Sequence, residues 1–114
     1  MFKITPFRQV KWPVTISVPQ DGGRVQKHEI TARFDILPQS RLDDLVRGQR
    51  GADEDKDLLR EVLLGWDGVA DEDGVAIEFA DAPRDQLLDI PYVRGALLKA
   101  YFEAASGSAA ARKN

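Results

Sequence analysis

The stretch from residue 58 to residue 79 constrains the fold of this chain more than any other part of the sequence. Its first half repeats large apolar residues at one-turn spacing, which predicts a helix with one buried stripe. The members of the stripe are Leu58, Leu59, Val62, Leu63 and Trp66. Burying such a stripe stabilises a fold by about 1.5–3 kcal/mol per large side chain. Two glycines bracket the Trp-Asp pair that follows, which predicts a helix ending in a left-handed residue.

The second half of this stretch predicts a turn and a short strand. The sequence Asp-Glu-Asp-Gly at residues 71–74 is typical of a tight acidic turn. Val75, Ile77 and Phe79 then alternate with Ala76 and Glu78, as in a half-buried strand. We therefore expect a helix–turn–strand unit against which the rest of the chain packs.

The length and composition limit the classes of protein that the chain can belong to. With 114 residues it is expected to form one domain that buries a core without covalent staples. The sequence contains no cysteine, which excludes disulfides and cysteine-bound metals. No apolar run approaches the ~18–20 residues of a membrane span. No long apolar segment follows the first residues, so we expect no signal peptide.

The charges are divided unevenly along the chain. Residues 1–50 carry nine Lys or Arg against five Asp or Glu, whereas residues 51–114 carry seven against fourteen. Such an asymmetry is compatible with self-association or with an oriented encounter with a partner. The interpretation that we favour is two solvated faces of different sign, because surface charge is weakly constrained by the fold.

The N-terminal part of the chain predicts a β-hairpin. Residues 10–18 alternate apolar with other residues, which predicts a strand with one buried face formed by Val10, Trp12, Val14, Ile16 and Val18. Pro13 has no N–H, so this strand lies at a sheet edge, is bulged, or begins there. An Asp-Gly pair at residues 21–22 predicts the turn. A second alternating segment follows, with Ile30, Ala32, Phe34 and Ile36 on its apolar face.

The remaining segments predict helices. Ser40 is the expected N-cap of a short helix that extends to Gly48, and the acidic residues at 53–57 suit the first turn of the next helix. Pro83 suits the first position of a third helix, with Leu87 and Leu88 as its apolar residues. Pro91 can open a last helix that ends near residue 105. Its predicted core face consists of Val93, Leu97, Ala100, Tyr101 and Ala104.

These predictions combine into an α+β fold. A small antiparallel sheet, formed by the N-terminal hairpin and a short third strand at residues 75–79, should pack against three or four helices. Residues 1–105 should form the single domain, and residues 106–114, which are small and polar, should form a mobile tail.

The sequence offers no convincing catalytic, cofactor or metal site. The acidic segment at residues 67–78 lacks the carboxylates that a calcium loop requires at its first and last positions. His28 is the only histidine and is interpreted as a residue on a strand surface. No nucleophile–base pair is visible, so we expect a protein that is not an enzyme.

Nucleic acid is not an expected partner. The hairpin is basic and carries Trp12, as some nucleic-acid surfaces do. However, Trp12 is in register with the buried face of its strand, the chain is acidic overall, and no binding motif is present.

The order of these segments resembles that of the small tail assembly chaperones of long-tailed bacteriophages. The resemblance covers nearly the whole chain, although it includes no catalytic motif. It is carried by residues 14–19 (VTISVP), the Asp-Gly pair at 21–22, residues 31–34 (TARF), residues 57–62 (DLLREV), residues 65–69 (GWDGV), residues 71–74 (DEDG), the Leu-Leu pair at 87–88 before Pro91, residues 96–102 (ALLKAYF), and the final Lys-Asn.

This resemblance implies a non-enzymatic helper of virion assembly in the host cytoplasm. Such proteins are thought to bind the long, apolar tape measure protein, to help recruit tail tube subunits, and to be absent from the mature virion. The resemblance therefore implies the tape measure protein and the tail tube protein as partners, with self-association also open and no membrane or cofactor involved. In many relatives a translational frameshift produces an extended form.

The last helix is the expected partner-binding surface. Its apolar residues extend around more of the helix than one core-facing stripe needs, and the candidates are Tyr92, Leu98, Tyr101 and Phe102. The alternative is that these side chains complete the core. A competing function is a small acidic phage protein that regulates or inhibits a host factor, based on the acidic charge of residues 51–114.

Overall fold

The fold is a three-stranded antiparallel sheet packed against four helices, as seen in a computed structural model that describes residues 1–4, 8–45 and 51–110. The predicted α+β class is thereby confirmed. The sheet has the order β1-β2-β3. In chain order the elements are β1 (Arg8–Pro19), η1 (Asp21–Gly23), β2 (Val25–Ile36), α1 (Gln39–Leu45), α2 (Ala52–Val62), β3 (Leu63–Asp67), α3 (Asp81–Leu88) and α4 (Pro91–Ser106).

The predicted hairpin is confirmed, and it forms most of the sheet. β1 and β2 pair over their full length, from Arg8 opposite Ile36 to Pro19 opposite Val25. The turn contains two glycines with φ of 78°, a conformation that side chains other than glycine rarely adopt. Pro13 lies in an edge strand, where its missing N–H costs no ladder hydrogen bond.

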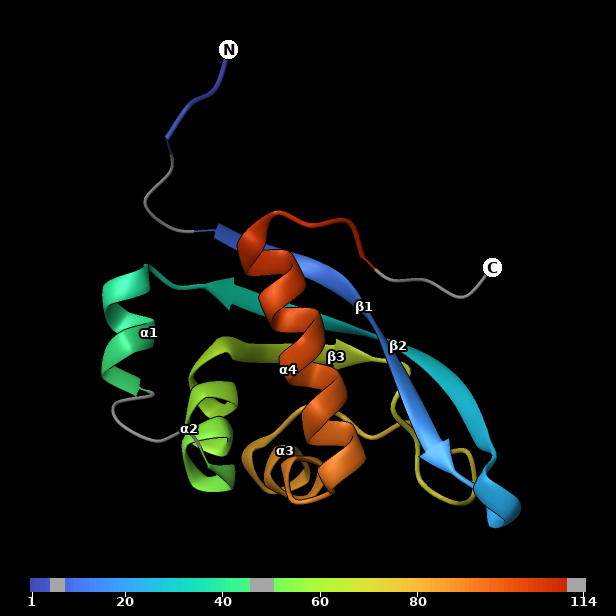
Figure 1. Cartoon of the computed structure of the whole chain (residues 1–114). Coiled ribbons are helices and arrows are strands. Elements are labelled where there is room, and N and C mark those ends of the chain that lie inside the picture. Colours follow the sequence, from blue (N-terminus) through green and yellow to red (C-terminus); the bar gives the residue numbers. More distant parts are fainter. Residues whose placement is uncertain (5–7, 46–50, 111–114) are drawn as a thin grey trace.

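One continuous core lies between the sheet and the helices. Alternate residues of the hairpin point into it, and α4 contributes a face that packs mainly against β1. Figure 1 shows α4 crossing the sheet, with α1 and α2 on one side of it and α3 near its N-terminal end. The fully buried large side chains are Tyr101, Phe34, Leu58, Leu59, Leu88, Leu97, Val14 and Val62.

The predicted helix over residues 58–66 is wrong in its second half. α2 ends at Val62, and the chain continues directly as β3, which pairs antiparallel with β2 through Leu63 opposite Phe34. Leu63 and Trp66 therefore belong to a strand. The edge of β2 would otherwise present unpaired N–H and C=O groups, and pairing with β3 satisfies them.

The predicted third strand at residues 75–79 is also wrong. The third strand is β3, and residues 75–79 form only an isolated bridge, between Ala70 and Ala76. The predicted left-handed glycine is present at Gly68, with φ of 94°, but it follows a strand and not a helix. Val75, expected to be half-buried, is 61% exposed.

The helix starts differ from prediction by small shifts. α1 begins at Gln39, so Ser40 lies inside the helix, and α3 begins at Asp81, so Pro83 is its third residue. The acidic first turn of α2 and the start of α4 at Pro91 are confirmed. α4 extends through Ser106 and is capped by Gly107 in the left-handed conformation. The predicted end of the first helix at Gly48 and the last four residues of the predicted tail lie outside the described residues.

Candidate functional site

An open groove of about 420 Å³ lies between the distal half of the hairpin, the segment after β3, and the start of α4. Most of its surface is apolar, and we call it the apolar groove. It is lined by Ile16, Val18, His28, Ile30, Gly68, Val69, Ala70, Leu87, Tyr92 and Val93. An open apolar depression bordered by polar residues is the kind of surface that binds another apolar chain.

The wall after β3 is positioned by Gly68. Its φ of 94° turns the chain back toward the hairpin, and a Cβ at this residue would lie 3.6 Å from the Ile30 Cα. Glycine therefore allows the conformation and the close approach together. Beyond it, the Asp71 carboxylate accepts the N–H groups of Asp73 and Val75 at 2.9 and 3.0 Å, which closes the acidic turn.

Trp66 anchors the same wall from the other side. Its Nε1 donates to the Ile77 carbonyl oxygen at 2.8 Å, and its ring packs edge-to-face on Phe79 with centroids 4.9 Å apart. Ile77 in turn donates its N–H to the Val69 carbonyl at 2.9 Å. One side chain of β3 thus holds the segment that carries Val69 into the groove.

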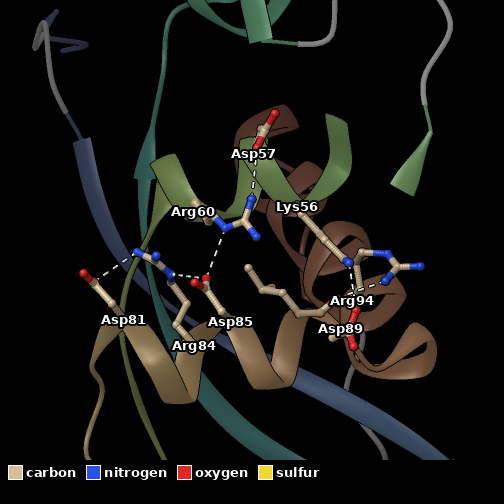
Figure 2. A network of polar contacts seen from close by, with 9 residues as sticks. Lys56, Asp57, Arg60, Asp81, Arg84, Asp85, Asp89 and Arg94 are labelled. Carbon is tan, nitrogen blue, oxygen red and sulfur yellow. Dashed lines mark hydrogen bonds and ion pairs between the residues drawn. The ribbon is translucent and has the colours of Figure 1, made fainter. Parts of the chain in front are cut away.

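The opposite wall depends on how α3 is held against α2. Figure 2 shows two basic side chains of α2, one turn apart, that reach one carboxylate in α3 and one on Asp89, the residue directly after α3. Lys56 Nζ contacts Asp89 at 2.8 Å, and Arg60 Nε contacts Asp85 at 3.1 Å. Arg84 contacts Asp85 at 3.1 Å from within α3. These exposed pairs link α2 to α3, the helix that presents Leu87 to the groove.

These ion pairs predict that the fold loses stability in acid. The hydrogen bond from Arg60 lowers the pKa of the Asp85 carboxyl below its ordinary 3.8, and the bond from Lys56 lowers the pKa of Asp89 in the same direction. A carboxyl with a lowered pKa favours folding above its ordinary pKa, and this contribution is lost as the pH falls through the folded-state value. Urea unfolding should therefore show a free energy that declines as the pH falls from about 5 to below 3.8.

A double variant isolates this effect. In Asp85→Asn/Asp89→Asn the decline of the unfolding free energy below pH 5 should be smaller than in the natural chain, because the two carboxyls no longer titrate. Asp73→Asn removes a carboxylate on the acidic turn, outside the network, and serves as the matched control. Equal pH slopes for the natural chain and the double variant would contradict the assignment.

The structure separates the four predicted partner-binding residues. Tyr92 lines the apolar groove and is 40% exposed, and Phe102 is 36% exposed farther along α4. Leu98 is partly buried against the core. Tyr101 is fully buried, because it lies with Val93 and Leu97 on the core-facing side of the helix. It is therefore not available to a partner, contrary to its prediction as a partner-binding residue.

Tyr101 instead joins α4 to the end of β2. Its hydroxyl donates to the Asp35 carbonyl oxygen and accepts the Leu37 N–H, each at 3.2 Å. Its ring packs edge-to-face on Phe34 with centroids 5.3 Å apart, and Phe102 packs on its other side at 5.6 Å. Burial raises the pKa of the Tyr101 phenol above its ordinary 10.0.

The other walls of the groove were not identified from the sequence. Ile16, Val18 and Ile30 were placed on the buried face of the hairpin, and they are on that face. The sequence does not indicate that the helices leave the distal end of this face partly uncovered. No sequence signal marks this groove, because it depends on how far the helices cover the two 12-residue strands.

A second depression lies at the polar side of the sheet. It encloses about 360 Å³ and includes Lys11, Thr31, Arg33 and Asp67 among its lining residues. Arg33 donates to the Leu64 carbonyl at 3.5 Å. His28 is exposed on β2, as interpreted from the sequence. Within residues 1–4, 8–45 and 51–110, no three His, Asp or Glu side chains converge in a way that would hold a metal ion.

Comparisons with known proteins do not assign the chain to a family. Searches against protein-family models, curated proteins and solved structures gave no match. Among the helices that the structure describes, none has the length and apolar character needed to cross a bilayer.

Proposed function

We propose that this chain is a non-enzymatic tail assembly chaperone of a long-tailed bacteriophage. In this role it binds the tape measure protein in the host cytoplasm, helps recruit tail tube subunits, and does not remain in the mature virion. The proposal combines the order of sequence segments described above with one structural observation, which is the apolar groove beside Tyr92.

The groove suits an apolar helical client. An amphipathic helix binds by laying its apolar face into a hydrophobic groove, with side chains about one turn apart as anchors. The floor here is formed by strands, and one wall is held by the ion pairs between α2 and α3. Such fixed walls reduce the entropy lost on binding.

The competing interpretation, an acidic inhibitor of a host factor, depends on unneutralised acidic charge in residues 51–114. Three of the carboxylates in this half, Asp57, Asp85 and Asp89, contact Arg60 or Lys56 within 3.1 Å. These contacts neutralise the three carboxylates locally. The observation that favours the chaperone is the apolar groove, which offers a surface to an apolar client.

A pair of matched variants tests the proposal. Tyr92→Ala removes an exposed aromatic side chain from the groove, and Phe102→Ala removes one of similar exposure elsewhere on the same helix. Central aromatic residues often contribute 2 kcal/mol or more to an interface, so Tyr92→Ala should weaken binding of a tape measure segment about 30-fold. Phe102→Ala should leave the affinity within about threefold of the natural chain.

The measurement is a calorimetric titration of each full-length chain with soluble segments of the tape measure protein. Thermal unfolding of both variants establishes that the fold is retained. Equal affinities for the two variants, or binding that only Phe102→Ala weakens, would place the client elsewhere and contradict the role of the apolar groove.

A further inference from the structure

The outer edge of the sheet is open along β1. Within residues 1–4, 8–45 and 51–110, β1 pairs only with β2, so every second residue of β1 directs its N–H and C=O away from the sheet. Proline is accepted in a strand where its missing N–H would face outward, which indicates that the backbone groups of Pro13 and Pro19 face the open side of β1. Alternate residues of a strand direct their backbone groups to the same side. Thr15 and Ser17, which lie two and four residues after Pro13, therefore also present their N–H and C=O groups to the open side.

A shallow groove of about 250 Å³ accompanies this part of the edge, and we call it the edge groove. It is lined by Thr15 and Ser17 of β1 and by Tyr92, Gly95, Ala96 and Lys99 of α4. Apart from its two chain neighbours and the backbone of its own helix, a Cβ at Gly95 would have no atom of the described residues within 4 Å. A strand edge with a helix alongside can receive an extended segment, which gains main-chain hydrogen bonds from the strand and side-chain contacts from the groove. The prolines at 13 and 19 limit the added strand to about five residues.

The same chain carries a segment of suitable chemistry at residues 1–4. Phe2 and Ile4 are 87% and 86% exposed, although large apolar side chains are favourably buried. They are two residues apart, so an extended backbone places both on one side and Lys3 on the other. Figure 1 shows this segment leading away from the domain, at the end of β1 opposite the hairpin turn.

Ile4 cannot reach the strand side of the edge groove of its own chain. Ile4 is four residues from Arg8, the first residue of β1, and four residues span at most about 14 Å. Thr15 is seven residues along the strand from Arg8, a distance of about 23 Å. Ile4 therefore cannot lie beside Thr15 unless the two residues belong to different copies.

We infer that residues 1–4 of one copy add a short strand to the β1 edge of a second copy and so join the two into a dimer. Phe2 and Ile4 lie in the edge groove, against the small residues Gly95 and Ala96 of α4. Each copy supplies one segment and one groove, and a dimer in which both contacts form has two-fold symmetry.

Sedimentation velocity over a range of concentrations tests this dimer. Gly95→Phe fills the edge groove at a position that accepts a side chain in the single copy, and Gly95→Ala is the matched control because it adds only a methyl group. Phe2→Ser/Ile4→Ser changes the exposed segment, with Lys3→Ser as its control. Gly95→Phe and the double variant should each weaken the dimer about 100-fold or more, and the two controls should not.

Several results would overturn the inference. They are a natural chain that remains monomeric at all concentrations, a dimer that survives Gly95→Phe, and a dimer that survives Phe2→Ser/Ile4→Ser. No client protein is present in this experiment, so its failure is distinct from a failure of the proposed chaperone function.

Cysteine trapping supplies a second test, since the chain has no cysteine of its own. An Ile4→Cys chain mixed with an Ala96→Cys chain should give a disulfide-linked heterodimer under mild oxidation, identified by its mass. Lys3→Cys in place of Ile4→Cys should give much less of this product, because residue 3 points to the other side of the added strand. Equal yields, or no heterodimer, would contradict the placement.

Discussion

Replacing Tyr101 with alanine should lower the free energy of unfolding by about 3–5 kcal/mol. The side chain is fully buried, and its ring contacts Phe34 and Phe102. Its removal leaves a cavity where α4 meets the end of β2. The Leu37 N–H and the Asp35 carbonyl also lose the hydroxyl that satisfies them. Urea unfolding followed by circular dichroism measures the change.

Tyr101→Phe separates the ring from the hydroxyl. This variant keeps the packing and should cost only about 1–3 kcal/mol, the penalty for unpaired buried polar groups. It should also change the response to alkali. Because the folded-state pKa of the phenol is raised, its contribution to stability is complete below 10.0 and is lost as the pH rises above that value. A natural chain and a Tyr101→Phe variant with the same decline above pH 10.0 would contradict the buried placement.

The second large effect is expected at Trp66. Trp66→Ala removes the ring from Phe79 and the donor from the Ile77 carbonyl, and should lower the free energy of unfolding by about 2–4 kcal/mol. The segment after β3 then loses its anchor. Hydrogen exchange should accelerate at the Ile77 and Gly74 amides, whose acceptors are the Val69 and Asp71 carbonyls.

Trp66→Phe is the control for this prediction. It keeps an aromatic ring beside Phe79 and removes only the indole donor, so its cost should be about 1 kcal/mol. Since Val69 lines the apolar groove, Trp66→Ala should also weaken client binding, and Trp66→Phe should weaken it less. Unchanged exchange after residue 68 in Trp66→Ala would show that Trp66 does not hold this segment.

Sequence patterns predicted the parts of the fold that local chemistry determines. The hairpin alternates apolar and polar residues because one face of each strand is covered, and Asp-Gly supplies the turn. α4 begins at Pro91, where the missing N–H is tolerated. In each case the residues that form the element also contain the signal.

The errors occur where distant residues decide the structure. Leu63 and Trp66 continue the spacing of the α2 stripe, but they form β3 because the edge of β2 needs a partner. The spacing of apolar residues within residues 58–66 cannot indicate that β2 needs a partner, because β2 lies about 30 residues away in the chain. Assigning residues 63–66 to a helix then left residues 75–79 as the apparent third strand.

The candidate site was predicted only in part for the same reason. Tyr92 falls outside the buried face of α4 and lines the candidate groove. Tyr101 is buried, as its predicted place on the core face implies, so it cannot also serve as a contact for a partner. Ile16 and Val18 give the signal of ordinary core residues. These two residues also line a groove because of where α4 begins relative to the hairpin. Tertiary packing sets that position, and the local sequence does not record it.

The most direct test of the chaperone proposal is co-expression of the full chain with the tape measure protein of the same phage, followed by affinity capture and size-exclusion chromatography. The proposal predicts a soluble complex of the two proteins, whereas the tape measure protein should precipitate when it is expressed alone. The complex should be lost with Tyr92→Ala and kept with Phe102→Ala. An insoluble tape measure protein that is never captured with the natural chain would contradict the proposal.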